Sequence, residues 1–233
     1  MNKFTIGVII AIVAVFGGLV IYNTVQNNNN AIDYSKYDAS KIITDTSDTG
    51  GIAEHVRGNS ESKVVVVEYA DFQCPGCASM MPKIDAVYEE YKDDVAFVFR
   101  NYPISYHQNA RAASAAGEAA ALQGYFWEMA DALYNNRTDW MNETGQTRTD
   151  RFVELFKSVA PEGDADKFKD EMEHNENFEK KINFDIGIGR NRSGVEATPS
   201  FYVNGSHIEI GENDSLDDFA KNIKNKIDEE LKK

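Results

Sequence analysis

The chain is poor in cysteine, with only Cys74 and Cys77 among its 233 residues. Two cysteines cannot build a framework of several disulfides. A structural disulfide between them would gain little stability from chain entropy, because the loop it closes is so short. A C-x-x-C motif can also supply two of the four ligands of a zinc site. The four histidines here are scattered singly, so they do not supply the other two ligands. The motif therefore indicates reversible dithiol–disulfide chemistry, with no metal.

Positive charge is also scarce. The chain has 24 Lys and Arg against 38 Asp and Glu, a formal net charge of −14. This balance argues against binding to nucleic acid or to an anionic lipid surface. No motif for a cofactor stands out, and we expect none. The length that remains after the N-terminal segment suits one domain with an insertion.

The first part of the chain reads as a membrane anchor. Residues 4–22 carry no charged side chain and are long enough to span the hydrocarbon core as a helix. A cleaved signal peptide is the alternative, but no small-x-small cleavage site follows Tyr22. With Lys3 on the inner side, residues 1–3 form a cytoplasmic tail and everything after the span lies outside the cell membrane. Residues 23–55, rich in Asn, Asp, Ser and Thr, read as a linker.

Local patterns around the cysteines predict a strand, a helix and a second strand. The β-branched run Lys63–Tyr69 is typical of a buried strand. A helix should follow with Pro75 in its first turn, and Pro82 should kink it. Val95–Arg100 reads as a second buried strand, so the two strands should pair in parallel through a right-handed crossover.

The rest of the chain completes an α/β pattern. A long helical region with no convincing strand, about 105–190, reads as an insertion. Strand patterns return at Ser200–Val203 and Ser206–Ile210 on either side of Asn204-Gly205, a strong hairpin turn. Ser215 opens a capping box, so an amphipathic helix should close the chain.

The motif also predicts different roles for the two thiols. Unpaired amides at a helix N-terminus stabilise a thiolate, which would make Cys74 the nucleophile and Cys77 the resolving thiol. Thr198-Pro199 directly precedes a predicted strand, where a proline is tolerated because it donates no ladder bond. If this X-Pro bond were cis, the Thr198 backbone would be free to pair with an extended substrate beside Cys74.

Two segments together carry a resemblance to a known family. Residues 68–77, EYADFQCPGC, and residues 197–201, ATPSF, are similar to the DsbA-like branch of the thioredoxin superfamily. The resemblance covers roughly residues 56–233 and implies a thioredoxin-like α/β domain with a helical insertion. It also implies that Thr198-Pro199 is a cis-proline loop facing the active site and that Glu68 is a buried acid serving as a proton relay. An exposed charge at a strand end is the alternative for Glu68. His107 could approach the site, but we favour a surface histidine at a helix start.

The function implied is that of a membrane-anchored, extracytoplasmic thiol-disulfide oxidoreductase of the cell envelope. Its Cys74–Cys77 disulfide would oxidise reduced secreted or envelope proteins, and a membrane quinone-linked thiol oxidase would reoxidise it. A disulfide reductase or isomerase of the same fold is one alternative. A non-catalytic binding or chaperone module, in which the thiols are incidental, is another.

Overall fold

The computed structural model describes residues 32–211 and 214–233. The predicted tail 1–3 and anchor 4–22, and the first residues of the predicted linker, lie outside this part of the chain. Within it, none of the helices combines the length and the apolar character needed to cross a membrane. Tyr34–Lys233 forms one compact unit.

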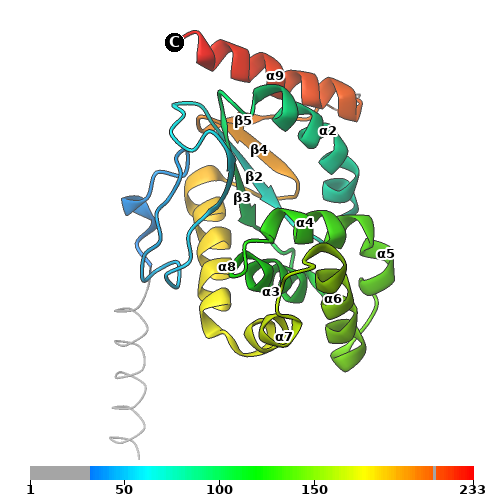
Figure 1. Cartoon of the computed structure of the whole chain (residues 1–233). Helices are drawn as coiled ribbons and strands as arrows, with labels where there is room; N and C mark the ends of the chain where they lie inside the picture. The colour runs from blue at the N-terminus through cyan, green and yellow to red at the C-terminus, as the bar shows by residue number, and fades with distance from the viewer. Residues whose placement is uncertain (1–31, 212–213) are drawn as a thin grey trace, which may run out of the picture. The chain divides into compact units, whose positions relative to one another are not determined.

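A mixed sheet lies at the centre of this unit (Figure 1). The described residues form five strands in the order β1-β3-β2-β4-β5. Their bounds are β1 His55–Gly58, β2 Val65–Ala70, β3 Ala96–Asn101, β4 Ser200–Val203 and β5 Ser206–Ile208. The strands predicted on either side of the motif are β2 and β3, and they pair in parallel as expected. Strand β1 was not predicted because its four residues, HVRG, contain a single apolar side chain and are too few to show a pattern.

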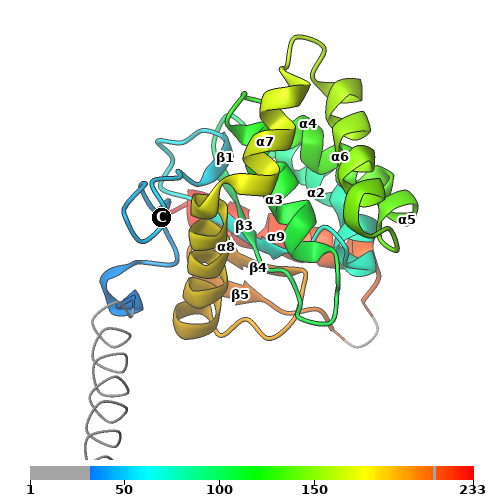
Figure 2. The same ribbon diagram turned by 90° about the horizontal axis from the view of Figure 1, so that it is seen from below.

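Helices pack around the sheet, and those from α3 to α8 form the predicted insertion. Between β2 and β3 lies α2, Pro75–Tyr91, which continues through Pro82. The insertion comprises α3 Ala110–Ala121, α4 Phe126–Asn135, α5 Arg137–Trp140, α6 Gly145–Val159, α7 Ala165–His174 and α8 Glu176–Ile188, the last followed by the π-helical turn η2, Gly189–Ser193. Figures 1 and 2 show α3 to α7 gathered as one group beside the sheet. The closing helix α9, Leu216–Leu231, begins at the predicted capping box.

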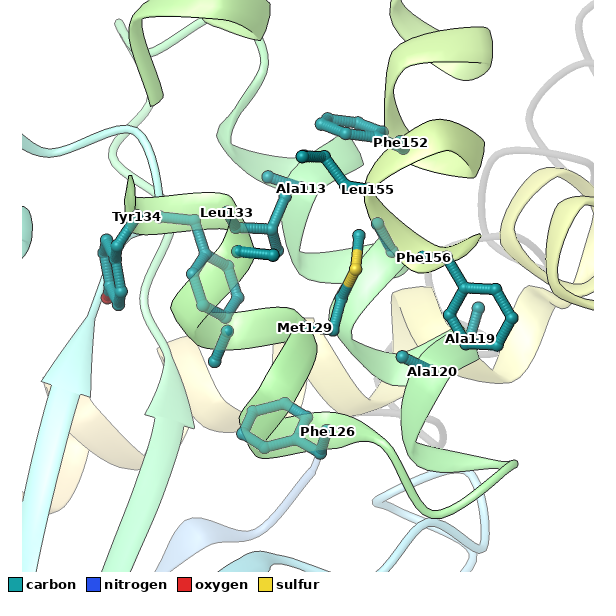
Figure 3. Close-up of a cluster of buried hydrophobic side chains, with 14 of the residues drawn as sticks. Ala113, Ala119, Ala120, Phe126, Met129, Leu133, Tyr134, Phe152, Leu155 and Phe156 are labelled. Atoms are coloured by element: carbon teal, nitrogen blue, oxygen red, sulfur yellow. The ribbon is translucent and has the colours of Figure 1, made fainter. Parts of the chain in front are cut away.

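Two apolar clusters hold these layers together. One lies between the sheet and helices α2 and α9, where Phe201 of β4 meets Phe219 of α9 at a ring distance of 5.6 Å. The other fills the insertion (Figure 3), where the small alanines of α3 let α4 and α6 pack closely. Its edge reaches the motif segment, because Tyr134 of α4 packs on Phe72 with ring centroids 5.1 Å apart.

The segment before β1 packs on the sheet through a buried arginine. Arg100 of β3 is fully buried, and its Nε donates to Glu54 Oε1 at 2.5 Å. Its Nη1 and Nη2 donate to the carbonyls of Ala39 and Lys41, each at 2.8 Å. The backbone N–H of Ile43 donates to the other carboxylate oxygen of Glu54 at 2.7 Å. These bonds fasten the segment to the sheet.

The compact unit therefore starts earlier than composition suggested. The polar residues of 23–55 read as a linker, yet from Tyr34 onward the chain belongs to the same unit as the sheet. The physical reason is the ion pair between Glu54 and Arg100, which joins positions far apart in sequence. Composition does not reveal such a pairing.

Candidate active site

Cys74 stands at the junction between β2 and α2. It is the N-cap residue of α2, with an extended backbone, and Pro75 follows as the first helical residue, as predicted. This position brings its Sγ to the amides of the first helical turn, which have no partner within the helix. Cys77 lies one turn further on. Both thiols are free and shielded from solvent, with Cys74 8% and Cys77 1% exposed.

The environment separates the acidities of the two thiols. The pKa of Cys74 is lowered to about 5, first by a hydrogen bond from the Cys77 thiol. Burial opposes this shift, whereas the Thr198 side chain and the backbone amides of Cys77 and Gly76 reinforce it. Burial raises the pKa of Cys77 well above its usual value, and its proximity to Cys74 adds to the rise. At neutral pH Cys74 is therefore a thiolate beside a protonated Cys77.

The loop before β4 lies against Cys74. The Thr198-Pro199 bond is cis, and Cys74 Sγ lies 3.4 Å from the carbonyl oxygen of Thr198, to which it donates only when it is protonated. A Cβ on Gly76 would approach Pro199 Cδ to 3.3 Å and Cys74 Sγ to 3.6 Å, so glycine lets the loop come close. Apart from its effect on the pKa of Cys74, the buried Oγ1 of Thr198 has no hydrogen-bond partner within the described residues. The structure thus joins the predicted loop to the motif.

Glu68 lies within β2 rather than at an exposed strand end. The residue is partly buried and lines a crevice between α2 and α4. Burial raises its pKa to about 7, with Arg57 lowering it and Asp85 raising it further. Its charge also acts on Cys77, whose pKa it helps to raise.

A buried carboxylate shapes the turn before Cys74 and was missed in the sequence. Asp71 is fully buried and accepts hydrogen bonds at 2.7 Å from the backbone N–H of Gln73 and of Ile104. His107 Nδ1 lies 2.7 Å from the same carboxylate, with the His107 side chain only 16% exposed. His107 is thus partly buried, and its ring faces the turn that precedes Cys74. Its partner lies 36 positions away in sequence, which no local pattern reveals.

The insertion holds the residue that precedes Cys74. The N–H of Asn109 donates to Gln73 Oε1 at 2.8 Å, and Gln73 Nε2 donates to the carbonyl of Met141 at 3.2 Å. Arg137 Nη1 donates to the Gln73 carbonyl at 3.2 Å. These contacts fix the backbone on which Cys74 stands. Gln73 and Asn109 carried no signal of this role in the sequence.

The arrangement suits thiol chemistry at a single site. A thiolate at a helix start, with a protonated thiol one turn away, is the geometry of dithiol–disulfide exchange. In the part of the chain that the structure describes, no three His, Cys, Asp or Glu side chains cluster in a way that could hold a metal ion.

Comparison with known proteins first gives a partial match to much longer proteins. The chain is 33% identical over 155 residues to Na(+)/H(+) antiporter NhaA 1 of Mycolicibacterium vanbaalenii. The match covers 65% of this chain but 23% of that protein. The chain therefore spans less than a quarter of this relative's length, and the antiporter name refers to the whole of that longer protein.

Matches over most of the chain point to one family. A family model described as Thioredoxin matches residues 51–225. The probable disulfide bond formation protein D of Bacillus cereus is 30% identical over 210 residues, covering 84% of this chain and 89% of that one. Oxidised BdbD from Bacillus subtilis superposes with a TM-score of 0.65 at 25% identity, over 83% of this chain and all of that one. The chain therefore belongs to the thioredoxin superfamily, in the DsbA-like branch of thiol-disulfide oxidoreductases that its motifs resemble.

Proposed function

We propose that this chain is a thiol-disulfide oxidoreductase that oxidises reduced proteins through a Cys74–Cys77 disulfide. The low pKa of Cys74, about 5, carries the proposal. A stable Cys74 thiolate favours the reduced dithiol over the Cys74–Cys77 disulfide. A disulfide whose reduced form is favoured in this way is a stronger oxidant. The name of the Bacillus cereus relative, probable disulfide bond formation protein D, supports the same direction.

The proposed reaction assigns a role to each thiol. A substrate thiolate attacks Cys74 Sγ, the Cys74–Cys77 bond breaks, and its electron pair leaves on Cys77, which takes up a proton. A second substrate thiolate then attacks the substrate sulfur of the mixed disulfide and releases Cys74 as a thiolate. Because a thiol of low pKa leaves fast, Cys74 suits this position. The substrate ends with a disulfide and the oxidoreductase with two thiols.

The proposed setting is the outer side of a cell membrane. The uncharged stretch 4–22 supports a single-pass anchor that keeps the catalytic domain among reduced secreted or envelope proteins. A membrane quinone-linked thiol oxidase is the proposed partner that restores the Cys74–Cys77 disulfide. Recovery of the full-length chain in the soluble fraction after cell lysis would contradict the anchor.

Equilibration with glutathione tests the direction of electron flow. We expect a reduction potential between about −270 mV, the thioredoxin value, and about −120 mV, the DsbA value. A potential at or below about −270 mV would instead favour a disulfide reductase. If a variant without either thiol kept full activity in cells, the chain would be a binding or chaperone module.

Replacing Thr198 with valine tests whether its hydroxyl acts on the sulfur. The hydroxyl is buried and meets no partner in the described residues, so a thiolate on Cys74 is a natural acceptor. Without it, the pKa of Cys74 should rise from about 5. The potential should fall by about 10–40 mV, as expected when one charge-assisted hydrogen bond is lost and partly replaced by water.

Thiolate absorbance against pH and the glutathione equilibrium measure both effects of Thr198→Val. Thr147→Val in the exposed part of α6 is the matched control and should change neither quantity. An unchanged pKa and potential in Thr198→Val would show that the hydroxyl does not stabilise the thiolate.

A further inference from the structure

One loop beside the redox motif contains no Asp, Glu, Lys or Arg. It consists of residues 102–109, YPISYHQN, and joins β3 to α3. Charged residues make up 27% of the chain, and the formal net charge is −14, so this loop differs from the rest of the sequence. A loop without formal charges can approach a polypeptide of either charge without repulsion of its own.

The loop exposes an aromatic ring at its tip. Tyr106 is 80% exposed, the highest value for a large hydrophobic side chain in residues 32–211 and 214–233, where Ile210 comes next at 52%. Single exposed apolar side chains are common on protein surfaces and need no function of their own. Tyr106 differs from such cases because the loop beneath it is fastened to the active site.

The tip of the loop is fastened to the turn before Cys74. The buried carboxylate of Asp71 accepts from the backbone N–H of Ile104 and lies 2.7 Å from His107 Nδ1. The backbone N–H of His107 donates to the carbonyl of Ile104 at 3.0 Å, which closes the tip into a turn. The carbonyl of Asp71 accepts the N–H of Cys74, also at 3.0 Å. Asp71 therefore contacts both the loop and the nucleophile.

The two ends of the loop are fastened as well. At its start, the buried Tyr102 donates from Oη to the carbonyl of Val195 at 2.6 Å, three positions before Thr198. At its end, the N–H of Asn109 donates to Gln73 Oε1 at 2.8 Å. The loop thus connects the turn before Cys74 with the segment that leads into the cis-proline loop. These bonds keep Tyr106 close to the active site.

The ring of Tyr106 packs against the ring of His107. The two rings meet edge to face, with centroids 4.7 Å apart and planes at 77°. This arrangement is favoured because the edge of an aromatic ring is positive and its face is negative. His107 is itself held by Asp71, so the Tyr106 ring is oriented before a partner arrives. A ring that is already oriented loses little freedom on binding.

The partner that suits this ring is an unfolded, reduced polypeptide. Cys74 is shielded from solvent, so the chain around a substrate cysteine has to be extended to reach it. Cysteine is among the most buried residue types in folded proteins, so its neighbours in the substrate include side chains that belong in a core. Before folding, these apolar side chains are still in water, where contact with an aromatic ring is favourable.

We propose that Tyr106 is a substrate-docking residue, which binds an aromatic or large aliphatic side chain of an unfolded polypeptide while a cysteine of that polypeptide reacts at Cys74. The proposal rests on the oxidoreductase function above and names the substrate class of the same site. Tyr106 contributes binding alone. It should therefore lower the peptide concentration that gives the half-maximal rate and leave the maximal rate unchanged. Dithiothreitol, which carries no such side chain, should react independently of Tyr106.

Matched peptides with two cysteines test the docking site. One peptide of each pair carries phenylalanine at a position between the second and the fifth from the first cysteine, and the other carries serine there. The oxidised protein is mixed with increasing peptide, and acid quench followed by alkylation measures the loss of the Cys74–Cys77 disulfide. At the best position, the phenylalanine peptide should need an about fivefold lower concentration for the half-maximal rate, as for one aromatic pair.

Three variants assign this preference to one ring. Tyr106→Ala should abolish the preference, whereas Tyr106→Phe keeps the ring and should keep it. Leu122→Ala is the matched control, since it removes another exposed apolar side chain, at the end of α3, and should also keep the preference. Because both positions are exposed, the variants should remain folded, which thermal melts verify. Reduction by dithiothreitol should proceed at the same rate in all of these proteins.

The docking hypothesis and the proposed function fail in different ways. If the two peptides reacted equally with the unaltered chain, or if the preference survived in Tyr106→Ala, the docking site would be overturned and the oxidoreductase function would stand. Slower reduction of Tyr106→Ala by dithiothreitol would also overturn it, because Tyr106 would then act on the sulfurs instead of on the substrate. If the unaltered chain oxidised no peptide and exchanged no disulfide with dithiothreitol, the proposed function itself would fail.

Discussion

Replacing Cys74 with serine should abolish both oxidative refolding of a reduced substrate protein and reduction of insulin. Serine forms no disulfide, and the thiolate of low pKa is lost with the sulfur. The remaining Cys77 is 1% exposed and has a raised pKa, so it should not take over the reaction. The yield of native substrate against time measures the loss, which should bring the rate down to the uncatalysed background.

Cys77→Ser is the matched variant, with a different expected result. Cys74 should still attack substrate disulfides, but no resolving thiol would release the product, so mixed disulfides through Cys74 should accumulate. Non-reducing gels and mass spectrometry detect them. Alkylation of the unaltered protein with limiting reagent at mildly acidic pH provides a second check, because Cys74 should be labelled first. Faster labelling of Cys77 would reverse the assigned roles.

Among the substitutions considered, Glu54→Ala should lower the free energy of unfolding the most. The substitution removes the carboxylate that pairs with the buried Arg100 guanidinium. In the unaltered chain the side chains of Arg100 and Glu54 are 0% and 1% exposed, respectively. Removing one partner of a buried ion pair costs about 3–5 kcal/mol. Arg100 keeps its two carbonyl acceptors. We therefore expect the free energy of unfolding to fall by about 3 kcal/mol, the lower end of that range.

Urea unfolding of Glu54→Ala and Glu61→Ala separates the buried pair from the general effect of removing a carboxylate. Glu61 is exposed near the start of β2, and its replacement should change stability by less than about 0.5 kcal/mol. A Glu54→Ala midpoint equal to that of the control would show that the segment before β1 contributes no stability to the domain.

Much of the fold follows from local signals. The β-branched run before the motif became β2, because such side chains pack well in a strand covered on both faces. The Asn204-Gly205 turn adopts the positive φ values, 46° and 80°, that a tight hairpin requires. Ser215 and Asp218 form the expected capping box. Each signal depends on residues within a few positions, so the sequence alone was enough.

The sequence by itself also determined where the two thiols lie, because a C-x-x-C motif at the start of a helix places them one turn apart. What surrounds the pair was decided by the tertiary structure. Thr198 meets Cys74 from 124 positions away, and Glu54 meets Arg100 from 46. The raised pKa of Glu68 arises first from its burial in a crevice that helices α2 and α4 help to form. Burial and long-range pairing exist only once distant segments pack together, and they set the acidities on which the chemistry depends.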